Sequence, residues 1–233
     1  MKREDILRLQ SLREDKQAVA LVTQLLDGQQ ALVSEQAIEG ALKLSDGTVT
    51  NIRQRLLEDL SGAISEGGSD LFVRVYNPPL RLILIGAVHV SQALIPMATL
   101  LGFNVTVIDP RTAFASDERF PTVTMLNDWP DQAIRILKPD HRSAVVTLTH
   151  DPKLDDPALK ETLQTDAFYV GSLGSRKTHA SRIERLVAEG IDEQSLSRIH
   201  APVGIHLGGR RPAEIALSII AQIVQTLRTT SLS

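Results

Sequence analysis

Strands and helices alternate in the hydrophobic pattern of residues 80–228. Short apolar runs, typical of strands, are followed by longer segments in which apolar residues recur at helical spacing. The predicted strands are residues 81–85, 103–108, 122–125, 143–148, 167–170 and 203–207. Five helices are predicted between and after these strands. One ends at residue 101, one begins at Asp156-Pro157, and the other three span residues 131–137, 176–189 and 212–227. This alternation predicts an α/β fold with a doubly wound, parallel, Rossmann-like sheet.

Residues 1–78 follow a different pattern. The predicted elements there are a helix over 2–15, strands over 18–26, 31–34 and 71–76, and a helix over 52–64. The chain then reads Asn77-Pro78-Pro79, and a pair of prolines can continue neither a strand nor a helix. We therefore predict a small α+β N-terminal domain of residues 1–78 and a Rossmann-like domain of residues 79–233.

Composition excludes several classes of function. The chain has no cysteine, which excludes disulfides, cysteine-ligated zinc, iron–sulfur clusters and a thiol nucleophile. Its formal net charge is −3 and its aromatic residues are 5 Phe, 2 Tyr and 1 Trp, which argues against a nucleic-acid partner. The charged start is not a secretory signal, and no apolar run approaches the roughly 18 residues of a membrane span. We expect a cytoplasmic protein with no membrane insertion.

The first candidate loop follows the strand over residues 81–85. Gly86 permits a sharp turn, and Asp109 ends the next strand 23 residues later, close to the roughly 20 expected for an acidic ribose-binding residue. Val88 stands where the full dinucleotide fingerprint has its second glycine. The spacing indicates a nucleotide site; the alternative is a glycine turn that binds nothing, with Asp109 capping the loop before Pro110.

The second candidate loop contains His150 and Asp151. In a 3-2-1-4-5 strand order the first and fourth strands are neighbours, so His89 and His150 are expected to face one crevice. Two imidazoles there could bind a ligand or transfer protons near neutral pH; alternatively each caps its own loop. No third ligand is spaced for a metal, and Asp155 and Asp156 are interpreted as helix-capping residues.

The third candidate loop, residues 171–177, is the strongest local signal. It opens a predicted helix with two glycines, two hydroxyls and two cations: Gly171, Ser172, Gly174, Ser175, Arg176 and Lys177. Free N–H groups at a helix start bind anions, and an arginine adds a bidentate contact. The alternative is Ser175 as a plain N-cap with solvated cations. A fourth loop carries Arg210 and Arg211, which are either anion ligands or a solvated pair.

The motifs of residues 80–228 together resemble the C-terminal domain of the XdhC/CoxI family. The matching segments are Gly86-Ala-Val-His89, Thr106-Val-Ile-Asp109-Pro-Arg111, Glu118-Arg-Phe-Pro121, Leu148-Thr-His150-Asp151, Tyr169-Val-Gly171-Ser-Leu-Gly174-Ser-Arg176, Ala201-Pro-Val-Gly204 and Pro212-Ala-Glu-Ile-Ala-Leu-Ser218. The resemblance implies an accessory protein for molybdenum hydroxylases such as xanthine dehydrogenase or carbon monoxide dehydrogenase. Such a protein binds the molybdenum cofactor and assists its sulfuration or insertion.

The resemblance also implies partners and a ligand. The apo-hydroxylase is the expected partner, with a cysteine desulfurase as sulfur donor, and we expect a homodimer. The loops would meet the phosphate or the nucleotide diphosphate of molybdopterin. The expected cofactor-binding residues are Gly86, His89, Asp109, Arg111, His150, Asp151, Gly171, Ser172, Gly174, Ser175 and Arg176.

Three features depart from the family pattern. Longer members carry a Cys-Gly-Gly segment in their N-terminal domain, whereas this chain has no cysteine and looks like a short form. Val88 replaces a usual glycine, and His206 and Gly209 lie where the family commonly has Gly-Leu-Asp-Ile-Gly-Ala. Cofactor binding through a cysteine is therefore excluded.

Two other functions compete with this interpretation. The first is an NAD(P)-dependent oxidoreductase that uses the Gly86/Asp109 site with His89 or His150 as acid–base; the missing second glycine counts against it. The second is a DNA-binding regulator with a helix-turn-helix over residues 42–60 and Gly47 in its turn. The balanced charges of residues 36–64 offer no phosphate-facing surface, and this hypothesis ranks last.

Overall fold

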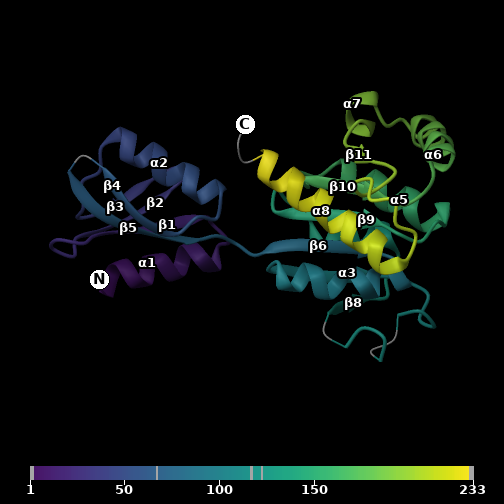
Figure 1. Cartoon of the computed structure of the whole chain (residues 1–233), viewed down its shortest axis with the longest axis horizontal. Helices are drawn as coiled ribbons and strands as arrows, with labels where there is room; N and C mark the ends of the chain where they lie inside the picture. The colour runs from purple at the N-terminus through teal and green to yellow at the C-terminus, as the bar shows by residue number, and fades with distance from the viewer. Residues whose placement is uncertain (1–2, 67, 116–117, 122, 231–233) are drawn as a thin grey trace. The chain divides into compact units, whose positions relative to one another are not determined.

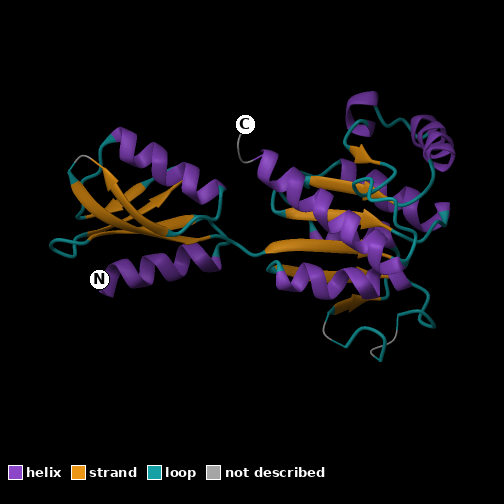
Figure 2. Ribbon diagram, in the orientation of Figure 1, coloured by secondary structure: helices purple, strands orange, loops and turns teal. Residues whose placement is uncertain are grey.

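The second half of the chain forms a six-stranded sheet in which every pairing is parallel (Figures 1 and 2). This computed structural model describes residues 3–66, 68–115, 118–121 and 123–230. The strands are β6 (Leu80–Ile85), β7 (Phe103–Ile108), β8 (Thr124–Leu126), β9 (Ser143–Thr147), β10 (Tyr169–Ser172) and β11 (Ile199–His200). Their order, β11-β10-β9-β6-β7-β8, confirms the predicted 3-2-1-4-5 arrangement. Thr122, predicted to begin the third strand, lies outside the described residues.

Helices cover both faces of this sheet because its strands are apolar on both sides. In β6, Leu82 and Leu84 belong to one buried cluster, whereas Ile83 and Ile85 belong to the other. The first cluster packs against α3 (His89–Leu100) and α8 (Pro212–Thr230). The second packs against α4 (Pro130–Leu137), α5 (Pro152–Leu163) and α6 (Arg176–Ala188), with the short α7 (Glu193–Leu196) following α6. The predicted α/β fold is confirmed.

The first part of the chain forms a smaller antiparallel sheet of five strands with two helices. The strand order is β3-β2-β1-β5-β4. The elements are α1 (Arg3–Glu14), β1 (Val19–Gln24), β2 (Gln30–Ser34), β3 (Ile38–Gly40), α2 (Asp46–Leu57), β4 (Gly62–Glu66) and β5 (Ser69–Tyr76). Apolar residues of α2 and α1 pack in two separate clusters with the sheet. Contacts group the chain into one unit within residues 1–78 and a second unit, Pro79–Thr230; we propose that each is a domain.

Two predictions in the first unit are wrong. The helix predicted over residues 52–64 is α2, which begins at Asp46 and ends at Leu57, and Ile64 lies in β4 opposite Leu71 of β5. Strand pairing with β5 decides the conformation there. Gly47 lies inside α2 rather than in a turn, so the helix-turn-helix interpretation is also wrong.

Two predictions in the second unit are also wrong. Residues 203–207 form no strand; the sixth strand is β11, which pairs with β10, and the N–H of Val203 donates to the carbonyl of Ser172 at 3.2 Å. The helix predicted to begin at Asp156-Pro157 begins five residues earlier, with Asp151 as its N-cap. Both Asp-Pro pairs carry the same local signal, and the chain uses the first.

Candidate functional site

The loops that follow β6, β9 and β10 lie at one edge of the sheet, because these three strands are adjacent and parallel. We call this the carboxyl edge. Gly86 has φ +117°, and a Cβ added there would stand 2.8 Å from Cγ2 of Thr149, so the loop after β6 lies directly against the loop after β9. The predicted juxtaposition of these loops is confirmed.

Gly171 and Ser172 lie within β10 and not in the loop predicted over residues 171–177, so the predicted start of that loop is wrong. A Cβ at Gly171 would clash with Tyr169 and Val203.

The Asp109 carboxylate is fully buried and already holds four hydrogen bonds. It accepts from the N–H of Ala87 at 2.8 Å, the N–H of Arg111 at 3.0 Å, and Nε and Nη2 of Arg111 at 2.9 and 2.8 Å. Burial by itself raises the pKa of Asp109, but the bonds from Arg111 and Ala87 outweigh it, and the pKa lies below its ordinary value. Asp109 thus ties the Gly86 turn to Arg111. Its oxygens are committed to protein donors rather than to a ribose.

His89 and His150 are both exposed at the carboxyl edge. His89 is the first residue of α3, and His150 follows β9 with φ +63°. Neither imidazole has a hydrogen-bond partner in the part of the chain that the structure describes, so no bond supports the alternative that each caps its loop. Asp151 does act as a cap, since its Oδ1 accepts from the N–H of Lys153 at 3.0 Å.

The amino end of α6, residues 174–177, presents a row of backbone donors. Ser175 is the N-cap, and its Oγ accepts from the N–H of Thr178 at 3.1 Å. Among the described residues, the N–H groups of residues 174–177 have no acceptor. Gly174 has φ +145° and Arg176 is exposed. Such a row at the start of a 13-residue helix favours an anion.

Ser172 does not reach this row. Its hydroxyl and that of Thr147 lie 2.6 Å apart, and both side chains are fully buried. They connect β9 and β10, which run parallel with Ser172 opposite Thr147. Ser172 therefore supports the two loops from below instead of facing a ligand.

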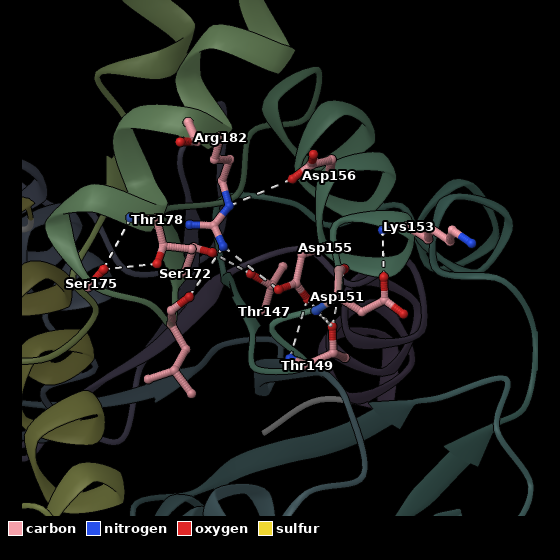
Figure 3. Close-up of polar contacts among 12 residues, drawn as sticks. Thr147, Thr149, Asp151, Lys153, Asp155, Asp156, Ser172, Ser175, Thr178 and Arg182 are labelled. Carbon is pink, nitrogen blue, oxygen red and sulfur yellow. Dashed lines mark hydrogen bonds and ion pairs between the residues drawn. The ribbon is translucent and has the colours of Figure 1, made fainter.

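A buried charge cluster, missed by the sequence analysis, lies beneath the loops following β9 and β10 (Figure 3). Arg182 reaches from α6 toward Asp155 and Asp156 of α5, and its side chain is only 2% exposed. Arg185 holds Asp156 through two hydrogen bonds of 2.5 and 3.1 Å. Thr149 Oγ1 donates to Asp155 Oδ1 at 2.7 Å, which anchors the loop after β9. The predicted capping role of Asp155 and Asp156 is therefore wrong: both lie inside α5.

Burial perturbs both members of the central pair. It raises the pKa of Asp155, against the opposing effects of the Thr149 hydrogen bond and the Arg182 charge. It lowers the pKa of Arg182, although Asp155 and Asp156 oppose this. The sequence contains no signal for this cluster, because the packing of α5 and α6 decides that Arg182 faces Asp155 and Asp156.

The fourth loop is closed by its own helix. Oε2 of Glu214 accepts from the N–H groups of Arg210 and Arg211 at 2.8 and 2.9 Å. These bonds hold the pKa of Glu214 below its ordinary value. The carboxylate occupies the place where an anion would meet these amides, so this loop is a capped helix start.

In the described ranges, no three His, Cys, Asp or Glu side chains gather as a metal site would require. No helix within those ranges has the length and apolar character needed to cross a bilayer.

The family of the chain follows from comparison with known proteins. The model of the XdhC Rossmann domain matches residues 82–223, more than half of the chain and nearly all of the parallel sheet. The chain belongs to the XdhC family. The match includes every loop of the carboxyl edge described above.

Several XdhC relatives are similar in sequence or structure. YqeB, an uncharacterized protein of Escherichia coli strain K12, is 32% identical over 167 residues, 72% of this chain and 31% of YqeB. A protein of Bacillus subtilis strain 168, named as a probable xanthine dehydrogenase subunit, is 31% identical over 159 residues, 68% of this chain and 46% of that protein. The molybdenum cofactor insertion chaperone PaoD of E. coli K12 is 28% identical over 148 residues, 64% of this chain and 40% of PaoD. The chain thus spans less than half the length of these curated relatives.

A solved structure shares the fold. A protein of Bacillus halodurans described as a xanthine dehydrogenase superposes with a TM-score of 0.71 at 24% identity, covering 97% of this chain and 65% of that one. At this identity the likeness concerns the fold.

Proposed function

We propose that this XdhC-family protein is an accessory factor that binds the molybdenum cofactor and assists its sulfuration or insertion into a molybdenum hydroxylase. The names of two relatives, one a molybdenum cofactor insertion chaperone and the other a probable part of xanthine dehydrogenase, support this assignment. The cofactor is cargo in this role. The apo-hydroxylase is its recipient, and a cysteine desulfurase supplies sulfur. We place these events in the cytoplasm and expect the protein to act as a homodimer.

The observation that carries the proposal is the amino end of α6 at the carboxyl edge. Four consecutive N–H groups, residues 174–177, have no acceptor within the described residues, and the exposed Arg176 lies among them. A cofactor bearing a phosphate or a nucleotide diphosphate matches these donors. Gly86, His89 and His150 lie at the same edge and would face the rest of the ligand. Asp109, Asp151 and Ser172 support this surface through their internal bonds, with Arg111 held by Asp109.

The alternative of an NAD(P)-dependent oxidoreductase loses its main support in the structure. It relied on Asp109 as a ribose ligand. That carboxylate is fully buried, with Oδ1 bonded to Arg111 and Oδ2 bonded to Ala87 and Arg111. We expect no substrate-dependent turnover of NAD(P)H with common alcohols, aldehydes or hydroxy acids.

Deletion of the gene tests the proposed function. The hydroxylase purified from the deletion strain should be synthesised but poor in molybdenum or in terminal sulfur, and the two contents distinguish insertion from sulfuration. The wild-type gene should restore both, and so should the control Arg135→Ala, which alters an exposed arginine on α4. A hydroxylase with full molybdenum, sulfur and activity in the deletion strain contradicts the proposal.

A further inference from the structure

Arg182 is a buried arginine with most of its hydrogen-bonding capacity unused. Its Nη2 donates to the carbonyl of Leu173 at 3.2 Å. Its ion pairs with Asp155 and Asp156 span 3.8 and 3.7 Å, too long for hydrogen bonds. Within the described residues, Nε and Nη1 of Arg182 and Oδ2 of Asp155 have no hydrogen-bond partner. Buried polar groups are nearly always paired, so these donors require an acceptor.

The surrounding carboxylates form no hydrogen bond with Arg182 in this arrangement, since Oδ2 of Asp155 stands 3.8 Å from Nη2 and is itself without a hydrogen-bond partner among the described residues. Asp156 is bound on both oxygens by Arg185, at 2.5 and 3.1 Å. Asp155 is held through Oδ1 by Thr149 at 2.7 Å. The cluster contains two carboxylates and two guanidinium groups, and Arg182 is the cation that neither carboxylate has engaged in a hydrogen bond.

The unused Nη1 of Arg182 lies just beneath the amino end of α6. A Cβ built on Gly174 would stand 3.9 Å from Nη1, and 3.2 Å from Cγ2 of Thr178. The guanidinium therefore lies close to the side of Gly174 on which a side chain would stand. Because Gly174 has no side chain, a ligand oxygen can approach its backbone from that side at van der Waals distance. Gly174 therefore leaves a path between the exposed row of amides and the buried arginine.

We propose that residues 174–177 and Arg182 together form a binding site for a phosphate monoester. One phosphate oxygen lies over Gly174 and accepts from Arg182 beneath it, and the remaining oxygens accept from the backbone amides and Arg176. A phosphate monoester has three terminal oxygens, one for Arg182 and two for the amides and Arg176, whereas a carboxylate has only two in all. This inference rests on the proposed function, because it names the part of the cofactor that this site holds and the buried residue that binds it.

Calorimetric titration of the full chain with inorganic phosphate, and separately with glycerol 3-phosphate, tests the site. Two variants remove different parts of it. Gly174→Ala fills the space over the arginine and leaves every charge in place. The double variant D155N/R182Q removes the buried cation without leaving an unpaired charge. Gly190→Ala is the matched control, since Gly190 also has a positive φ, +86°, and has nothing within 4 Å of an added Cβ.

We expect both phosphates to bind the wild type and the Gly190→Ala control with equal affinity, and both test variants to bind at least about tenfold more weakly. Acetate should bind none of these proteins measurably. If the double variant does not fold, Gly174→Ala still decides, because it keeps the charge cluster intact. The inference is overturned if the wild type binds neither phosphate, if it binds inorganic phosphate alone, or if folded Gly174→Ala binds as tightly as the wild type.

This experiment is independent of the deletion experiment. Phosphate binding is measured on the isolated protein and requires no hydroxylase. Weakened binding in the variants together with a complete hydroxylase in the deletion strain would preserve the site and refute the proposed function. Unchanged phosphate binding in the variants, together with an incomplete hydroxylase in the deletion strain, would preserve the proposed function and refute the site.

Discussion

Asp109→Asn should destabilise the C-terminal unit although it changes only one atom. The carboxylate accepts two bonds on each oxygen: Arg111 N–H and Nε on Oδ1, Ala87 N–H and Arg111 Nη2 on Oδ2. An asparagine keeps one oxygen and replaces the other with an NH₂ group, which is a donor. Whichever way the amide is oriented, one backbone N–H and one guanidinium N–H then face a donor.

The magnitude follows from the exposure of each group. An unsatisfied buried N–H costs about 1–3 kcal/mol. The Arg111 side chain is 34% exposed and can turn to water, so the loss of its ion pair adds only about 0–1 kcal/mol after solvent screening. We therefore expect a loss of about 1–4 kcal/mol in the free energy of unfolding. A loss of about 2 kcal/mol would lower the Tm of this unit by about 4–8 °C.

Trp129 provides a selective assay. It is the chain's single tryptophan and the N-cap of α4, so its fluorescence follows the unfolding of the C-terminal unit alone. Urea unfolding at pH 7 compares the wild type, Asp109→Asn and the control Asp166→Asn. Asp166 is exposed, so the control should differ from the wild type by less than about 0.5 kcal/mol. An Asp109→Asn protein as stable as this control would refute the structural role assigned to the carboxylate.

Three further predictions can be checked with the same protein. The folded-state pKa of Asp109 is lowered, so its contribution to stability is complete above the unfolded pKa of about 3.9 and disappears as the pH falls through the folded pKa. The difference in unfolding free energy between the wild type and Asp109→Asn should therefore close in acid. A difference that persists at all pH values argues against this linkage. Arg176→Ala should change stability by less than about 0.5 kcal/mol but weaken phosphate binding about tenfold in calorimetry, and unchanged affinity would leave Arg176 as a solvated residue. Gly204→Ala should lower the Tm more than Gly102→Ala. A Cβ at Gly204 would stand 2.3 Å from Ser218 Oγ, whereas a Cβ at Gly102 meets nothing within 4 Å. Equal decreases in Tm would show that the positive φ alone sets the cost of both substitutions.

The order of the parallel strands and the loops at their ends could be predicted from the sequence. Apolar runs such as residues 81–85 and 143–148 need to be buried on both faces, and helices between them impose parallel crossovers. Gly86 and Gly174 mark turns because their backbone angles are positive, a property that depends on the residue itself. The turns arise from interactions within a few residues along the chain, whereas the strand order follows from the general arrangement of doubly wound parallel sheets.

Competing local signals were decided by pairing with other elements of the fold, one of them far along the chain. Asp151-Pro152 and Asp156-Pro157 are equally good helix starts, and the choice is consistent with the bonds that Asp156 makes with Arg185 of α6. In the same way, residues 62–66 became a strand because β5 pairs with them. Arg185 lies 29 residues from Asp156, outside any local window, whereas β5 begins at Ser69, three residues after β4 ends, and forms a hairpin with it.

The buried charge cluster shows most clearly what only the tertiary structure decided. By itself the sequence determined that α6 begins with Ser175 and two cations, as an anion-binding helix start would. That Arg182 is buried against Asp155, with donors left unused beneath Gly174, depends on how α5 and α6 pack on the sheet. An arginine in a charged helix is ordinarily solvated, and its burial requires carboxylates that another helix brings next to it. Those carboxylates take their places only in the folded structure.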